Sequence, residues 1–182
     1  MGKIHLYIIV FFLFVSCATH TNDFRTYASQ IETLPTPLTF RTTEFFDQKL
    51  KDKIDESLFN KYKYAYADNV YGKIWDTDSS VTILYLVNGD IITPVLVTYD
   101  KEGNKIDSLN LFENASGFNL EKETYVTATC YFNKTIQEID SISTWTLNDK
   151  MTDRIQGSEK KRVDSIMYFI NGSGKIISNK HD

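Results

Sequence analysis

The stretch that decides the fold is Val81–Phe112, VTILYLVNGDIITPVLVTYDKEGNKIDSLNLF. Three runs within it are rich in β-branched and aromatic residues, which favour strands: 81–87, 91–99 and 105–112. Asn88-Gly89 predicts a two-residue hairpin turn, and Asp100–Gly103 predicts a second turn. In the first run apolar residues alternate onto both faces, which indicates a central strand that is covered on both sides.

Working outward, the same composition predicts further strands at 72–76, 124–132, 135–147, 162–170 and 175–178. Strict alternation would place Asp107 on the face of Leu109, which predicts a bulge or a strand start there. Residues 43–59 carry the one strong helical pattern, an apolar stripe at intervals of four that comprises Phe46, Leu50, Ile54 and Leu58. We therefore expect a mainly β fold, an antiparallel meander sheet that is curled or forms a sandwich, with one N-terminal amphipathic helix.

Length and composition indicate one globular domain. The chain has 182 residues, 42% hydrophobic and 24% charged, which argues against disorder or a fibrous repeat. The net charge is −4 with both signs interspersed, so the basic footprint of a nucleic-acid-binding protein is missing.

The first residues predict export. Lys3 precedes an unbroken apolar run, Leu6–Val15, which is too short to span a membrane and is typical of a signal peptide. The run leads into Phe14-Val15-Ser16-Cys17, which resembles the lipobox of bacterial lipoproteins but has Phe14 where that family usually has Leu. The resemblance implies that Cys17 is acylated and becomes the first residue of a membrane-anchored chain. The alternative is an ordinary signal peptide with a chance cysteine.

The lipobox resemblance also suggests a cellular location and a division of the chain into segments. Ala18 follows the cysteine where Asp would imply inner-membrane retention, so we expect the outer membrane of a Gram-negative bacterium. Residues 1–16 are then the signal peptide, 17–40 a tether with Pro35 and Pro37 that favour extended backbone, and 41–182 the β-rich domain. Cys130 is the one other cysteine, and its place on an apolar strand face predicts a buried, unreactive thiol.

Tyr62, Tyr64 and Tyr66 alternate along Lys61–Tyr71 and are a candidate aromatic surface for binding a glycan, because ring faces stack on sugar rings. The alternative is that these rings cover the core, as tyrosines often do.

Other chemistry has few candidates. The three histidines are His5, His20 and His181, and all lie outside the predicted helix and strands, so imidazole-dependent hydrolysis and zinc sites find no ligand. Asp76–Val87 lacks the Gly and Glu of a calcium loop, and Gly172–Lys175 lacks the pattern of a phosphate loop. No spacing among the 24 acidic residues singles out a catalytic pair. We expect no cofactor and no metal.

Between Leu34 and Ile176 the chain resembles a family of uncharacterised lipoproteins of the Bacteroidota. The shared pieces are a strand ending P-x-L-V-T-Y-D at Pro94–Asp100, G-x-K-I-D-S-L at Gly103–Leu109, and a terminal G-K-I at Gly174–Ile176. The resemblance implies a location in the cell envelope and a β-rich domain. It implies no activity.

The motif Asp-Ser-[Ile/Leu] occurs at Ser108, Ser141 and Ser165 and resembles the acceptor of the general O-glycosylation system of Bacteroidota. The alternative is that Asp and Ser end turns by bonding local backbone. Taken together, we expect a lipid-anchored envelope protein that acts as a non-catalytic binding or structural module, with an envelope protein or a glycan as partner. The alternative function is a carboxylate-dependent glycan hydrolase, which a buried acidic pair facing a cleft would favour.

Overall fold

A computed structural model describes residues 23–44, 54–116 and 119–179, and it is mainly β, as predicted. The described helices are residues 23–29 and α2 (Glu56–Tyr62). The strands are β1 (Leu38–Arg41), β2 (Asn69–Asp76), β3 (Ser80–Val87), β4 (Thr93–Asp100), β5 (Lys105–Asn110), β6 (Lys122–Cys130), β7 (Thr135–Thr144), β8 (Lys160–Ile170) and β9 (Ile176–Asn179).

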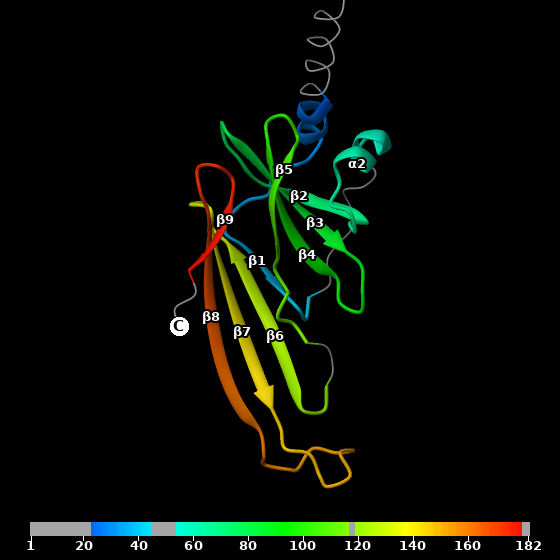
Figure 1. Cartoon of the computed structure of the whole chain (residues 1–182), viewed down its shortest axis with the longest axis vertical. Coiled ribbons are helices and arrows are strands. Elements are labelled where there is room, and N and C mark those ends of the chain that lie inside the picture. The colour runs from blue at the N-terminus through cyan, green and yellow to red at the C-terminus, as the bar shows by residue number, and fades with distance from the viewer. Residues whose placement is uncertain (1–22, 45–53, 117–118, 180–182) are drawn as a thin grey trace, which may run out of the picture.

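The strands form two antiparallel sheets that do not close into a barrel. One is the predicted meander, in the order β2-β3-β4-β5. The other has the order β1-β6-β7-β8-β9, a second meander that β1 joins at the edge beside β6. The two sheets lie one against the other in Figure 1.

Helices cover one face of the four-stranded sheet. Phe24 and Tyr27 from the first helix pack against Ile83 and Tyr85 of β3. The Tyr27 and Tyr85 hydroxyls are hydrogen-bonded at 2.9 Å, which satisfies two buried polar groups inside this apolar cluster.

The opposite face of the same sheet packs on the five-stranded sheet. Leu84 and Leu96 from the first sheet share a buried cluster with Ala128, Cys130 and Ile136 from the second. Strand β3 is therefore covered on both faces, which confirms its prediction as a central strand. The Cys130 side chain is buried, and burial raises the pKa of its thiol to about 12, so the predicted unreactive cysteine is also confirmed.

The predicted tether is wrong from residue 23 onward. Phe24, Tyr27 and Ile31 are buried in the core, because their spacing of three and four residues places them on one face of a helix that packs on the sheet. Leu38–Arg41 then pairs with β6 as a strand. The globular domain therefore includes residues that we expected to be a spacer.

The predicted helix at 43–59 is confirmed over residues 56–59 and is wrong at 43–44 and 54–55, which are not helical. Residues 45–53 lie outside the described residues, and α2 begins only at Glu56, where the Asp55 carboxylate accepts hydrogen bonds from the backbone N–H groups of Ser57 and Leu58. The helix then continues to Tyr62, which we expected in an extended segment.

Two turn predictions have different outcomes. Val87 pairs with Thr93, so residues 88–92 form a longer loop in place of the two-residue turn. The turn predicted at 100–103 is present. Gly103 there has φ +89°, a backbone conformation that glycine adopts easily because it has no Cβ.

The bulge predicted beside Asp107 is confirmed, because the pairing register between β4 and β5 shifts between Thr98 and Tyr99.

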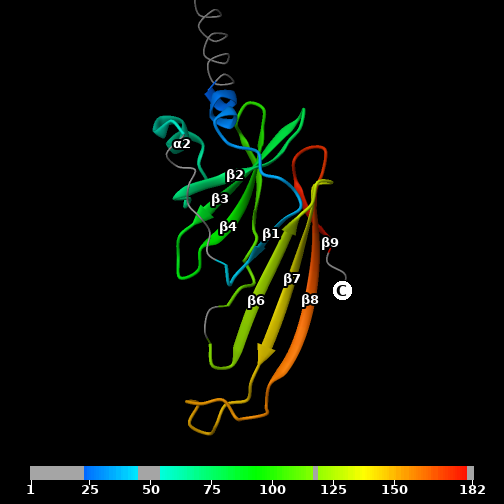
Figure 2. The same ribbon diagram turned by 180° about the vertical axis from the view of Figure 1, so that it is seen from behind.

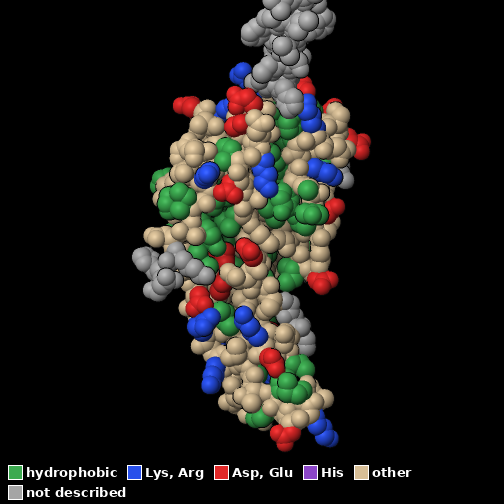
Figure 3. All heavy atoms as spheres, in the orientation of Figure 1, with side chains coloured by type: hydrophobic (Ala, Val, Ile, Leu, Met, Phe, Trp, Pro, Cys, Tyr) green, Lys and Arg blue, Asp and Glu red, His purple; other side chains and the backbone are tan. Residues whose placement is uncertain are grey.

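The lower halves of β6, β7 and β8 extend beyond the four-stranded sheet, as both views show (Figures 1 and 2). Strand β9 pairs only with Met167–Ile170, so β8 is an edge strand over its first residues. No helix among the described residues is long and apolar enough to cross a membrane. Figure 3 shows acidic and basic side chains interspersed over the visible face, in keeping with the small net charge.

Candidate functional site

An open groove of about 540 Å³ lies on the part of the five-stranded sheet that extends beyond the four-stranded sheet. Alternation along each strand directs every second side chain to this inner face. We call it the sheet groove, and the residues that line it are Asn114, Lys122, Thr124, Asp140, Ile142, Arg162, Val163, Asp164, Ser165 and Ile166.

Two acidic side chains of β7, Glu138 and Asp140, are buried at the upper end of this inner face. Only 1% of Glu138 and 4% of Asp140 is exposed to solvent. The Asn114 side-chain amide donates a hydrogen bond of 2.8 Å to Oε1 of Glu138. With both groups ionised, Oε2 of Glu138 and Oδ1 of Asp140 have no donor.

The two carboxyl groups hold protons more tightly than usual. Burial is the main cause that raises the pKa of Glu138 to about 7, the Asn114 hydrogen bond opposes it, and the charge of Asp140 adds to it. Burial likewise raises the pKa of Asp140. A proton held between the two carboxyls satisfies the pair at low pH, since protonated Glu138 then donates to Asp140.

Charges of both signs surround the pair. Asp164 of β8 lies directly opposite Asp140 in the register, and its charge also raises the pKa of Asp140. Arg162 forms an ion pair of 2.8 Å with Asp164, while Lys122 lies near Asp140 and lowers its pKa. Asp140 and Asp164 therefore line the groove together with the cations Lys122 and Arg162, whereas Glu138 does not line it.

A hydroxyl group adds a second kind of unsatisfied atom. Thr124 of β6 lines the groove, is 3% exposed, and its Oγ1 has no hydrogen-bond partner. Ser116, which pairs with Thr124 in an isolated β-bridge, also has a buried hydroxyl without a partner. Buried polar atoms are normally hydrogen-bonded, so unsatisfied acceptors beside an open groove indicate where a ligand can bind.

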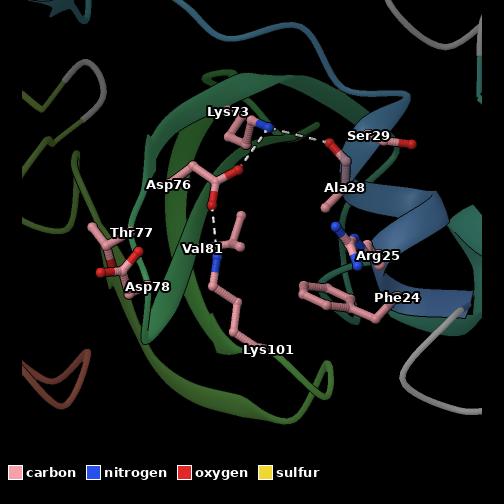
Figure 4. A pocket seen from close by; sticks show the side chains of 10 residues that line it. All are labelled: Phe24, Arg25, Ala28, Ser29, Lys73, Asp76, Thr77, Asp78, Val81 and Lys101. Carbon is pink, nitrogen blue, oxygen red and sulfur yellow. Dashed lines mark hydrogen bonds and ion pairs between the residues drawn. The ribbon is translucent and has the colours of Figure 1, made fainter. Parts of the chain in front are cut away.

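A second pocket of about 610 Å³ lies between residues 23–29 and the end of β2. Figure 4 shows Lys73 and Lys101 on either side of Asp76, at 3.0 and 2.7 Å from its two carboxylate oxygens. Burial acts to raise the pKa of Asp76, but these two lysines outweigh it and lower the pKa. Because these charges satisfy one another, we assign them to packing the first helix on the sheet.

The three tyrosines of the candidate aromatic surface do not form one exposed row. Tyr62 is buried in the last turn of α2, and its backbone carbonyl accepts a hydrogen bond of 2.7 Å from the Tyr99 hydroxyl. Tyr64 is half-buried, whereas Tyr66 is 74% exposed. The row fails because the segment is not extended: Tyr62 ends α2 and Tyr66 lies in the turn that follows, so Tyr62 covers the core, as the alternative interpretation expected.

The other predicted residues are spread over the molecule. Ser141 and Ser165 are exposed on β7 and β8, and Ser108 is half-buried on β5. Cys17 and the three histidines lie outside the described residues. Among residues 23–44, 54–116 and 119–179, no three or more His, Cys, Asp or Glu side chains are grouped so that they could hold a metal ion.

The sequence does single out one acidic pair, contrary to our expectation. Glu138 and Asp140 alternate between Ile136 and Ile142 on one strand face, and two acids inside such a face are a signal that the sequence contains. Thr124 and Asn114 carry no comparable signal. No family model, curated protein or solved structure matches this chain.

Proposed function

We propose that this chain is a lipid-anchored protein of the cell envelope that acts as a non-catalytic binding module, and that its ligand occupies the sheet groove. The anchoring part rests on the signal peptide and on the resemblance of Phe14–Cys17 to a lipobox. The same resemblance favours the outer membrane, where a glycan or another envelope component would be the partner.

The observation that carries the binding site is the set of buried acceptors without donors beside an open groove. Asp140 and Thr124 belong to different strands and both line the groove, and Oδ1 of the one and Oγ1 of the other are buried without a hydrogen-bond partner. Leaving such groups without a hydrogen bond costs about 1–3 kcal/mol each, so a ligand that supplies donors there recovers part of that free energy.

A carboxylate-dependent glycan hydrolase is the second candidate. It is favoured by the pKa of Glu138, raised by burial to about 7, which suits a general acid at neutral pH. The contact between Glu138 and Asp140 opposes it, because glycosidases separate their two carboxyl groups by at least about 5 Å to flank the sugar.

The test uses the full-length protein in non-ionic detergent, with envelope saccharides and small metabolites as ligands. We expect binding that Thr124→Val and Asp140→Asn weaken while Asp78→Asn, a substitution at an exposed residue outside the groove, leaves it unchanged. Ligands that bind all variants equally would contradict the site. Cleavage products that disappear in Glu138→Gln would establish the hydrolase instead.

A further inference from the structure

We infer that the pocket of about 610 Å³ between residues 23–29 and the end of β2 binds a phosphate group, which docks between Arg25 and Lys101. We call it the helix pocket. It shares no lining residue with the sheet groove, so this inference goes beyond the proposed function.

Arg25 supplies a cation whose hydrogen-bond donors are unused. The residue is exposed on the first helix, and no described residue accepts a hydrogen bond from its side chain or forms an ion pair with it. Asp23, the nearest acid along the chain, pairs instead with Lys61 of α2 at 2.8 Å. A guanidinium carries five N–H donors and no acceptor, so all five are open to a ligand.

Lys101 supplies a second cation, on the side of the pocket across from Arg25 (Figure 4). Its ammonium lies 2.7 Å from one carboxylate oxygen of Asp76, and Lys73 binds the other oxygen at 3.0 Å. An ammonium has three donors, so two of those on Lys101 remain, and its side chain is 38% exposed. A ligand that enters from solvent therefore meets free donors on both sides.

The charge of the helix pocket favours an anion. Three cationic and two acidic side chains line it, which gives a net charge of +1. Asp76 is held between two lysines, and Figure 4 shows Asp78 beside Thr77 on the far side of the pocket from Arg25. The acids therefore leave the space between Arg25 and Lys101 positive.

Packing beneath the two cations fixes the segments that carry them. The rings of Phe24 and Tyr99 are in contact, with 5.3 Å between their centroids. Gly103 lies so close to the first helix that an added Cβ would come within 2.7 Å of the Phe24 side chain. The helix that carries Arg25 thus packs directly on the turn that carries Lys101. Donors that are already positioned cost less to order when a ligand binds.

The arrangement of the donors favours phosphate over carboxylate. A phosphate group is tetrahedral and directs its oxygens to several sides, so cations on facing sides of the pocket can bind it at once. A guanidinium can also donate two parallel hydrogen bonds to two of those oxygens. A carboxylate has both oxygens at one end, which a single guanidinium satisfies.

The position of the helix pocket in the fold points to a membrane lipid as one source of the phosphate. The first helix lies at the end of the molecule opposite the loop at 145–159 (Figure 1). Asp23 comes six residues after Cys17, a length of chain that spans at most about 22 Å. An acylated Cys17 would hold this end near the lipid headgroups. That source rests on the proposed anchoring, whereas a soluble phosphate ester does not require it.

The first experiment titrates the full-length protein in non-ionic detergent with glycerol 3-phosphate and follows binding by calorimetry. Glycerol serves as the neutral comparison, and succinate as a carboxylate of similar charge. We expect only the phosphate to bind well, and its affinity to fall as the salt concentration rises. Equal binding of glycerol would overturn the inference, and equal binding of succinate would overturn the phosphate class.

Four variants locate the site. Arg25→Gln should weaken the binding of glycerol 3-phosphate by about tenfold, and Lys101→Gln by about fivefold. Arg25→Lys keeps the charge but loses the paired donors, so we expect a loss of about threefold. Lys160→Gln changes the net charge equally at an exposed residue of β8 and should leave the affinity within about twofold. An equal loss in Lys160→Gln and Arg25→Gln would mean diffuse attraction and would overturn the site.

A second experiment distinguishes the two sources of phosphate. Phosphatidylglycerol is added to the detergent micelles, and its headgroup is followed by phosphorus NMR. If the lipid is the source, the wild-type protein broadens the headgroup resonance, Arg25→Gln does not, and glycerol 3-phosphate reverses the effect. If only glycerol 3-phosphate shows a dependence on Arg25, the source is a soluble ester. If neither probe depends on Arg25, the inference is wrong, whatever the separate tests of Cys17 and of the sheet groove show.

Discussion

The carboxylate of Asp107 in β5 accepts a hydrogen bond of 3.0 Å from the backbone N–H of Ile176 in β9, and so connects the two sheets. Its other oxygen accepts from the backbone N–H of Ser108 at 2.8 Å. Both contacts depend on the bulge that turns Asp107 away from strict alternation. An acidic residue that interrupts an apolar pattern here forms a polar contact between the two sheets.

Asp107→Ala should lower the free energy of unfolding by about 1–3 kcal/mol, because two backbone donors lose their acceptor. Urea denaturation of the wild-type and variant proteins measures the difference. Asp78→Ala is the matched control at an exposed aspartate and should change stability by less than about 0.5 kcal/mol. Equal stability of the two variants would mean that Asp107 does not connect the sheets.

Leu84→Ala should cost about 2–5 kcal/mol, since this side chain is fully buried between the two sheets and its truncation leaves a cavity. Val163→Ala, at a position that is 67% exposed on β8, provides the control and should be nearly neutral. A loss below about 1 kcal/mol for Leu84→Ala would show that the second face of β3 is solvated.

Stability should fall as the pH rises from about 4.5 to 7, because burial raises the pKa of Glu138 to about 7 and the folded state therefore binds this proton more tightly than the unfolded chain does. The protonated Glu138 side chain makes its full contribution to the free energy of unfolding below pH 4.5, and this contribution is lost above pH 7. Its size is of the order of 3 kcal/mol.

The comparison of wild-type with Glu138→Gln isolates that contribution, because all other titrating groups are shared. In urea melts at pH 5 and pH 8, the variant should gain stability relative to the wild-type at pH 8 and lose the Glu138-dependent slope. Parallel pH profiles for the two proteins would be inconsistent with a raised pKa at Glu138.

Membrane anchoring is tested at Cys17, which lies outside the described residues. Mass spectrometry of the native protein should find a mature chain that begins with an acylated Cys17, and Cys17→Ser should leave an unlipidated or unprocessed protein. An unmodified N-terminus at Ala18 or later would exclude the lipoprotein assignment.

O-glycosylation at Asp-Ser-[Ile/Leu] predicts an excess mass over the lipidated polypeptide in protein from its own host. The excess should disappear in the double variant Ser141→Ala, Ser165→Ala, because both serines are exposed and a bulky glycan needs a surface position. Ser108→Ala should retain it, since Ser108 is half-buried. If the wild-type protein shows no excess mass, the O-glycosylation prediction is wrong. The Asp-Ser pairs then serve only to hydrogen-bond the local backbone.

The sequence predicted most strands because the alternation of Val81–Val87 and of β6 and β7 is strong. It failed at Asn88-Gly89, where pairing of Val87 with Thr93 overrides the local turn preference and where the Asn88 N–H donates to Asp68 of a distant segment. Residues 23–31 were missed because a short apolar spacing beside Pro35 reads equally well as a linker.

Part of the candidate site could be predicted from the sequence. Glu138 and Asp140 stand at alternating positions of one strand, so their shared face follows from the sequence. The hydrogen-bond donor of Glu138 does not follow from the sequence, because Asn114 is 24 residues away. Thr124 becomes informative only when its hydroxyl proves to lack a partner.

The unpaired stretch of β8 has a consequence for crowding on a membrane surface. Lys160, Lys161 and Arg162 are exposed at the start of this strand, where no described strand pairs with its outer edge. Two copies that met edge to edge and antiparallel would bring like charges close together, which opposes strand-by-strand polymerisation. If the proposed lipid anchor holds the molecules at high local density on a membrane, these charges would keep them separate.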